Sequence, residues 1–196
     1  MVRALLIAPL LAFSVASTSM SADWASAGGA LFVGGDNLKA TRGPGTGAPL
    51  PLAQPFSEVI EATAHARNLD PKLLHALVLV ESGYEATAVS RAGAMGLTQL
   101  MPKTAQELGV RDPFDPAENL AGGATYLAAQ LERFGDLRLA LAAYNAGPSR
   151  VAAIGAIPNI PETRSYVAKV IDCLLALATG RVVRSARACP SQETSP

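Results

Sequence analysis

The sequence is poor in charge, histidine and cysteine. Only 16% of its 196 residues are charged, and 16 Lys and Arg balance 16 Asp and Glu. A nucleic-acid-binding protein needs a basic excess for its phosphate contacts, so this balance speaks against that class of partner. The two histidines, His65 and His75, and the two cysteines do not form the pattern of a metal site. We expect the histidines at helix surfaces or boundaries, and no metal or cofactor.

The apolar run near the N-terminus is too short to cross a membrane. Residues 4–13 are apolar, whereas a membrane-spanning helix needs roughly 20 such residues. Arg3 precedes this run and small residues follow it, which is the pattern of a secretory signal peptide. We therefore predict an exported, periplasmic protein whose mature form has no membrane span. The signal peptide lies within residues 1–27, and three cleavage positions fit: after Ala16, Ala22 or Ala27.

The two cysteines, Cys173 and Cys189, are a candidate disulfide. An oxidising compartment lets such a pair close, and the bond would attach the C-terminal tail to the helix before it. Closing a loop of this size is worth roughly 3 kcal/mol in the chain-entropy model. The alternative is that Cys173 is only a small buried apolar residue. We predict the disulfide.

The rest of the chain divides into an arm, a helical domain and a tail. Residues 28–55 are dense in Gly and Pro and read as a linker. From residue 56 onward the apolar spacing is helical, and no alternating strand pattern stands out. Asp-Pro pairs open two of the helices, because Asp is a good N-cap and Pro fits the first helical position. We predict a compact all-α domain of six or seven helices over residues 56–180, followed by a tail over 181–196.

A single glutamate, Glu81, ends an apolar helix on its buried face. At 100° per residue, Leu74, Leu77, Val78 and Glu81 fall on one stripe, so the carboxyl group occupies the place of the next core residue. Loss of hydration there raises the pKa of a carboxyl group. A carboxylic acid that is still protonated near neutral pH can act as a general acid. The alternative is a solvent-exposed glutamate at a helix end.

Two further segments offer polar groups for a ligand. Gln99 stands on an apolar loop with glycines at 93 and 96, which permit unusual backbone angles and close approach of a ligand. Tyr144 and Asn145 supply a phenol and an amide at the end of a later helix. Such groups suit sugar hydroxyls or N-acetyl groups. Their plainer explanations are a buried Gln, a boundary tyrosine and a capping asparagine.

Five motifs occur in a fixed order along the chain: ESGY at 81–84, GAMGLTQLMP at 93–102, NLAGGATYL at 119–127, AAYNAGP at 142–148 and PETRSYV at 161–167. In this order and at these intervals they resemble the soluble lytic transglycosylase family, whose catalytic domain is related to goose-type lysozyme. The resemblance covers nearly all of residues 56–178 and implies a lysozyme-like helical fold. Thr98 replaces the methionine of the commoner GLMQ form of the second motif, while Gln99 is retained.

The resemblance implies cleavage of peptidoglycan at the β-1,4 bond from N-acetylmuramic acid to N-acetylglucosamine. In the family the 6-hydroxyl of the muramic acid, not water, displaces the leaving group and gives a 1,6-anhydro product. At the matching position Glu81 is the single acid and base, and Tyr144 would hydrogen-bond and orient it. The other residues that the resemblance assigns to the substrate site are Ser82 beside the acid, Gln99, Met101 and Asn145 in the cleft, and Tyr166 from the last helix.

A second carboxylate, which most glycosidases need, is hard to find in the sequence. Glu85 lies after a glycine in an apparent loop, Asp112 and Asp115 sit in a Pro-rich turn as caps, and Glu162 begins a helix. One carboxylate suffices if the substrate's own 2-acetamido group assists. A hydrolytic muramidase of the same fold is the nearest alternative, and it would need a second carboxylate to hold water.

Whether the protein has partners other than peptidoglycan glycan strands depends on its role in the cell. Small exported chains of this kind resemble the transglycosylases that open the wall for a secretion or conjugation apparatus, and ordinary wall turnover is the other hypothesis. A weakly active wall-binding accessory protein would be expected to have lost the acid or the Tyr144–Asn145 pair, and both are present.

Overall fold

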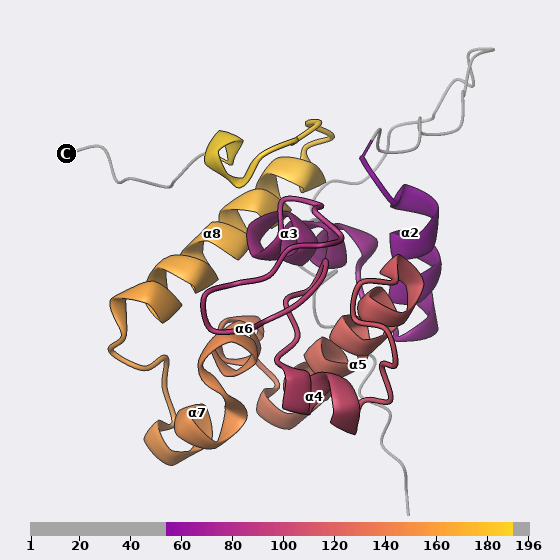
Figure 1. The fold of residues 1–196 in the computed structure, drawn as a ribbon. Coiled ribbons are helices and arrows are strands. Elements are labelled where there is room, and N and C mark those ends of the chain that lie inside the picture. The colour runs from indigo at the N-terminus through magenta and orange to yellow at the C-terminus, as the bar shows by residue number, and fades with distance from the viewer. Residues whose placement is uncertain (1–53, 190–196) are drawn as a thin grey trace, which may run out of the picture. The chain divides into compact units, whose positions relative to one another are not determined.

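The computed structural model describes residues 54–189, which form an α-helical domain (Figure 1). Seven α-helices follow one another: α2 (Ser57–Ala66), α3 (Pro71–Glu81), α4 (Pro102–Glu107), α5 (Pro116–Phe134), α6 (Leu137–Ala146), α7 (Pro148–Ile154) and α8 (Pro161–Ala178). A short 3-10 helix, η2 (Ala186–Ala188), comes last, and extended pairing within residues 54–189 is limited to isolated bridges at Met95. The predicted all-α fold is confirmed. The predicted signal peptide and most of the predicted linker lie outside the described residues.

The helix starts follow the sequence signals. Asp70 caps α3 by accepting a hydrogen bond from the Lys72 amide at 2.8 Å, and Pro71 occupies the first helical position. Asp115 caps α5 by accepting from the amide of Glu118 at 2.8 Å. Such caps satisfy amide groups that have no partner within the helix itself. The Asp-Pro pairs therefore mark the beginnings of the two helices that support the candidate site.

The centre of the domain is α3, which lies between α8 and α2 (Figure 1). Every residue from Leu73 to Leu79 is buried, so the helix is covered on all sides. The most extensive helix contacts are those of α3 with α8 and of α5 with α6. The last two residues of α3, Val80 and Glu81, are half-buried.

His75 is buried inside this core, so the expectation of a surface or boundary position was wrong. The side chain is 0% exposed, and its Nδ1 atom lies 3.0 Å from the hydroxyl oxygen of Tyr84. Burial lowers the pKa of His75 to about 4, which keeps the imidazole neutral at physiological pH. The all-apolar surroundings of His75 on α3 were the signal for burial, since no face of that helix is polar enough to meet water.

The predicted disulfide between Cys173 and Cys189 is present and joins α8 to the segment after η2. Val183, between the two, is 2% exposed, and its carbonyl oxygen accepts a hydrogen bond of 2.6 Å from the Gln54 side-chain amide. Residues 181–189 therefore pack on the helical domain. Among the residues that the structure describes, no helix is both long and apolar enough to span a bilayer.

Candidate active site

Glu81 ends α3 with its carboxyl group in an apolar setting. Leu74, Leu77 and Val78, which share its stripe on the helix, are all 0% exposed, so the predicted burial of this face is confirmed. Glu81 itself is half-buried. Burial raises the pKa of its carboxyl group to about 7, and a hydrogen bond from Tyr166 acts in the opposite direction and lowers the pKa. The carboxyl group therefore exchanges its proton near neutral pH.

Tyr166, not Tyr144, holds the Glu81 carboxyl group. The Tyr166 hydroxyl donates to Glu81 Oε1 at 2.6 Å from the second turn of α8. The Tyr144 hydroxyl donates instead to the carbonyl oxygen of Thr98 at 2.8 Å, so the predicted Tyr144–Glu81 bond is wrong. A phenol has one proton to donate, and Tyr144 uses it on the loop. Burial is the main cause that raises the pKa of Tyr144, and the negative charge of Glu81 is the second. Tyr144 is therefore close enough to Glu81 to interact with its charge.

Ser82 and Gln99 fix the loop that follows α3. The Ser82 hydroxyl lies 2.8 Å from the Leu97 carbonyl oxygen and 3.2 Å from that of Val78. Gln99 has a positive φ of 50°, and its side-chain nitrogen donates to carbonyl oxygens of Ala88 and Gly96 at 3.1 and 2.9 Å. Both side chains thus make hydrogen bonds to carbonyl oxygens of the loop itself. The amide oxygen of Gln99 accepts no hydrogen bond from residues 54–189, which leaves it for a ligand donor.

The back of this loop rests on α5 through a group of buried polar residues. Thr98 is 0% exposed, and both its backbone amide and its hydroxyl donate to Asn119 Oδ1 at 2.8 Å. Asn119 in turn donates to the Met95 carbonyl oxygen at 3.0 Å. A Cβ atom added to Gly123 would stand 2.3 Å from Thr98 Oγ1, so this glycine permits the close approach. Thr98, which replaces the methionine of the commoner motif, therefore anchors the loop to α5. Its partner Asn119 was not predicted from the sequence.

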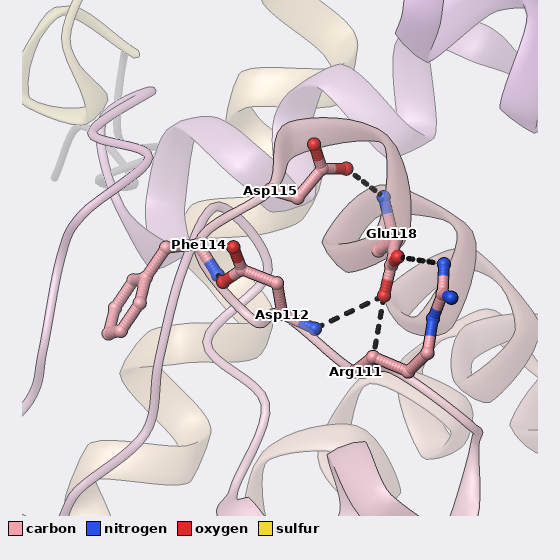
Figure 2. Close-up of polar contacts among 5 residues, drawn as sticks. All are labelled: Arg111, Asp112, Phe114, Asp115 and Glu118. Carbon is pink, nitrogen blue, oxygen red and sulfur yellow. Dashed lines mark hydrogen bonds and ion pairs between the residues drawn. The ribbon is translucent and has the colours of Figure 1, made fainter.

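The turn before α5 is held by a separate polar network, which Figure 2 shows. The carboxylate of Glu118 accepts hydrogen bonds from the Asp112 and Arg111 amides at 3.1 and 2.8 Å and from Arg111 Nη2 at 2.6 Å, and these bonds lower its pKa. Asp112 accepts from the Phe114 amide at 2.9 Å, and Asp115 caps α5. Both aspartates thus have the turn and capping roles predicted for them.

Met101 and Asn145 remain accessible near the end of the loop and of α6. Met101 is 44% exposed at the start of α4. Asn145 is exposed, and its Oδ1 atom accepts a hydrogen bond of 2.9 Å from the hydroxyl of Thr163 on α8. Thr163 precedes Tyr166 by one helical turn, so both point from the same face of α8. Thr163 was not predicted from the sequence, although its spacing of three residues from Tyr166 places both on one helix face.

Among residues 54–189, no other acidic side chain lies close enough to shift the pKa of Glu81. Its pKa shift arises from burial and Tyr166 alone, with no contribution from a neighbouring carboxylate. Glu85 is exposed and accepts hydrogen bonds from Thr87, which lower its pKa, and Glu162 is exposed at the start of α8. Within the described part of the chain, His, Cys, Asp and Glu side chains do not gather in any group of three or more that could hold a metal ion.

Replacing Tyr166 by Phe is expected to raise the pKa of Glu81 further, because the hydrogen bond that lowers it is lost. The basic limb of the pH–rate profile should move to higher pH, and turnover should fall roughly tenfold as the carboxyl group loses its orientation. Tyr144→Phe is the matched control, since that hydroxyl contacts Thr98. The assignment would be wrong if Tyr144→Phe moved the profile and Tyr166→Phe did not.

Comparisons with known proteins identify the family of the chain. Residues 58–166 match the family described as "Transglycosylase SLT domain", and the chain belongs to that family. It is 44% identical over 114 residues to a "Transglycosylase" of Enterobacteria phage PRD1, and 37% identical over 103 residues to "Membrane-bound lytic murein transglycosylase F" of Desulfosudis oleivorans. An inactive glutamate-to-glutamine mutant of the lytic transglycosylase Slt from Pseudomonas aeruginosa has a similar solved structure, with a TM-score of 0.58 and 28% identity.

These similarities cover only part of each relative. The phage match spans 58% of this chain and 41% of the relative, and the second match spans 49% and 23%. The solved structure is matched over 66% of this chain and 25% of its own. The chain thus spans less than half the length of these relatives, and the family assignment rests on the domain that holds Glu81.

Proposed function

We propose that the protein is a lytic transglycosylase that cleaves the β-1,4 bond between N-acetylmuramic acid and N-acetylglucosamine in peptidoglycan, with Glu81 as its single acid and base. The observation that carries the proposal is the state of Glu81. It is a desolvated carboxyl group with a pKa of about 7, it accepts a hydrogen bond from Tyr166, and in the described part of the chain no acidic neighbour shifts its pKa. Such a group is partly protonated at neutral pH and can both donate and accept a proton.

The reaction needs two proton transfers at Glu81. The protonated carboxyl group first gives its proton to the glycosidic oxygen as the bond to C1 of the muramic acid breaks, so that N-acetylglucosamine leaves as an alcohol. The resulting carboxylate then takes the proton of the 6-hydroxyl group as that oxygen bonds to C1. No water is consumed, a 1,6-anhydro end forms, and Glu81 returns to its protonated state. The hydrogen bond from Tyr166 supports the carboxylate between the two steps.

A single carboxylate favours this route over hydrolysis. Hydrolytic glycosidases position a second carboxylate to activate water or to attack the sugar. The acids nearest in sequence to the motifs are engaged elsewhere: Glu85 with Thr87, Asp112 and Asp115 in the turn before α5. In the absence of a second carboxylate, the substrate's 2-acetamido group would stabilise C1 after the glycosidic oxygen has begun to leave and before the 6-hydroxyl oxygen has bonded to C1. The inactive glutamate-to-glutamine mutant of the Pseudomonas relative involves the same chemical change that would disable Glu81 here.

The remaining site residues would bind the glycan strand. Met101 offers an exposed apolar surface for the face of a sugar ring, and the free oxygen of Gln99 can accept from a hydroxyl or N–H group. Asn145 contributes an amide at the end of α6. Ser82 acts beside the acid by holding the loop to α3.

The proposed place of action is the periplasm, where the predicted signal peptide would deliver the chain and where the glycan strands lie. A relative of similar sequence is named as membrane-bound and as acting on murein, in agreement with an envelope location. A secretion or conjugation apparatus would be the partner if the protein opens the wall locally. Wall turnover would need no partner of that kind.

Digestion of purified peptidoglycan in water enriched in heavy oxygen tests the reaction. We expect muropeptides one water lighter than hydrolytic products, carrying no label, and absent with Glu81→Gln. Labelled reducing ends would make the protein a muramidase. Binding without products from the wild-type protein would contradict enzymatic function and favour a wall-binding accessory role.

A further inference from the structure

We propose that Thr163 is a positioning residue that orients the Asn145 side chain, so that Asn145 presents its N–H donors, and no acceptor, to an acceptor oxygen of the substrate such as the carbonyl of an N-acetyl group. The contact behind this proposal is the hydrogen bond of 2.9 Å between Thr163 Oγ1 and Asn145 Oδ1. The inference rests on the proposed function, because it concerns substrate binding at the same site.

The direction of this hydrogen bond follows from the place of Thr163 in α8. Thr163 is the third residue of the helix and is 2% exposed, so its hydroxyl proton needs an acceptor within the protein. A helical threonine usually donates to the carbonyl four residues earlier, but that position lies before Pro161, where α8 begins. Asn145 Oδ1 is the acceptor at hand. The hydroxyl therefore donates, and the amide oxygen of Asn145 is the atom that faces α8.

The consequence concerns the other half of the amide. Asn145 is exposed at the end of α6, and none of residues 54–189 accepts a hydrogen bond from its Nδ2 atom. An amide whose oxygen is occupied offers only donors on its free side. Such a group selects oxygen atoms that accept, such as the carbonyl of an acetamido group. A freely rotating asparagine side chain would offer both a donor and an acceptor, and it would not discriminate between acceptor and donor groups of the substrate.

The pair lies at the catalytic site rather than elsewhere on the surface. Asn145 follows Tyr144, whose pKa is raised by burial and then by the charge of Glu81. Thr163 lies one turn before Tyr166, which donates to Glu81 at 2.6 Å. The same two elements, α6 and α8, thus carry the groups around the acid and the oriented amide. The bond between Thr163 and Asn145 also links these two elements directly.

The test is a double-mutant cycle on binding of N-acetylglucosamine oligomers, measured by titration calorimetry, with turnover of peptidoglycan measured in parallel. Thr163→Val keeps the shape of the side chain and removes its proton; we expect Kd and KM to rise roughly tenfold, with kcat changed by less than about threefold. Thr163→Ser should restore binding to within about twofold. Adding Thr163→Val to Asn145→Ala should cause no further loss, because the threonine acts through the amide.

Two more variants keep the inference falsifiable if Thr163→Val folds poorly. Asn145→Asp retains an acceptor for Thr163 but replaces the outward donor by an oxygen, so it should weaken binding at least as much as Asn145→Ala. Thr179→Val, at the other end of α8 where the hydroxyl donates to Ala176, should leave binding unchanged. Wild-type affinity in Asn145→Asp, or a full additional loss from Thr163→Val in the Asn145→Ala background, would overturn the proposal.

Failure of this inference can be told apart from failure of the proposed function. Cleavage of peptidoglycan by the wild-type protein, with Thr163→Val binding as the wild type does, would overturn the positioning role and leave the lytic activity in place. Oligomer binding that depends on Thr163 and Asn145 as described, without any cleavage, would support the oriented amide and contradict the enzymatic proposal.

Discussion

Replacing Glu81 by Gln is expected to abolish cleavage and, above pH 7, to make the fold more stable. Glutamine keeps the size of the side chain and cannot exchange the proton that both steps need, so turnover should fall by roughly a thousandfold or more. Release of muropeptides from purified peptidoglycan measures this loss. Glu85→Gln is the matched control, because Glu85 is exposed four residues away and its carboxylate accepts hydrogen bonds from Thr87. Equal losses in both variants would contradict the assignment of Glu81.

The gain in stability follows from the raised pKa. The pKa of Glu81 is about 7 in the folded protein against 4.5 for an ordinary glutamate, so the folded state keeps its proton to higher pH than the unfolded chain does. Ionisation therefore costs stability as pH rises from 4.5 through 7, up to about 3 kcal/mol. Glutamine carries no charge and escapes that cost. Urea unfolding of both proteins at equal pH isolates this effect, because the contribution of buried His75 is then the same in each.

The pH dependence of the stability difference between wild type and Glu81→Gln tests the raised pKa of Glu81. Below about pH 4.5 the two proteins should have similar stability, since the glutamate is neutral in both folded and unfolded states. The difference should appear between pH 5 and 7 and then level off. A stability difference that is constant with pH would mean that the Glu81 carboxyl group is ionised normally and that burial is not the source of its chemistry.

Replacing Gly96 by Ala should disrupt the loop that carries Gln99. Gly96 has a φ of +76°, and an added Cβ atom would lie 2.1 Å from the Pro113 carbonyl oxygen and 2.3 Å from Asn119 Nδ2. Because the Pro113 oxygen is a backbone atom, a change of side-chain rotamer cannot remove this clash. The loop and the turn before α5 would have to move apart. Strained backbone and overpacking together should cost about 2–5 kcal/mol. Activity should fall with it, because Ser82 and Gln99 both hydrogen-bond to this loop.

Gly93→Ala separates the two causes. Gly93 also has a positive φ, of +85°, but nothing lies within 4 Å of its added Cβ atom. This variant should lose only the backbone term, about 1 kcal/mol, and should keep most of its activity. Denaturant unfolding of the two variants provides the measurement. Equal destabilisation would show that the approach of Gly96 to Pro113 has no energetic importance.

The helices and the acid could be predicted from the sequence because their signals are local. Asp-Pro pairs and the stripe that ends in Glu81 each act over a few residues, and the structure follows them closely. The order and spacing of five motifs, also readable from the sequence, carried the resemblance to a family. The disulfide was predicted from compartment and count alone, and Cys173 and Cys189 are indeed bonded.

The features that could not be predicted are contacts between side chains that are far apart in the sequence. Tyr144 and Tyr166 both lie near the acid, and the choice of partner for Glu81 is decided by whether the Thr98 carbonyl is within reach of Tyr144. The contact between Thr98 and Asn119 joins residues 21 positions apart and exists only because Gly123 leaves room for it. The position of His75 was predicted wrongly because burial of a single polar residue depends on the helix around it, and Leu73 to Leu79 of α3 are buried on every face.

The most direct test of the account is the titration of Glu81 itself. Carbon-13 NMR of the side-chain carboxyl groups in glutamate-labelled protein follows each group through its own pKa, and Glu81→Gln identifies the signal. We predict one carboxyl group that titrates at about pH 7, absent from the variant and shifted to higher pH by Tyr166→Phe. A Glu81 signal that titrates near 4.5 would contradict the account, because the residue would then be ionised at neutral pH and unable to serve as the acid.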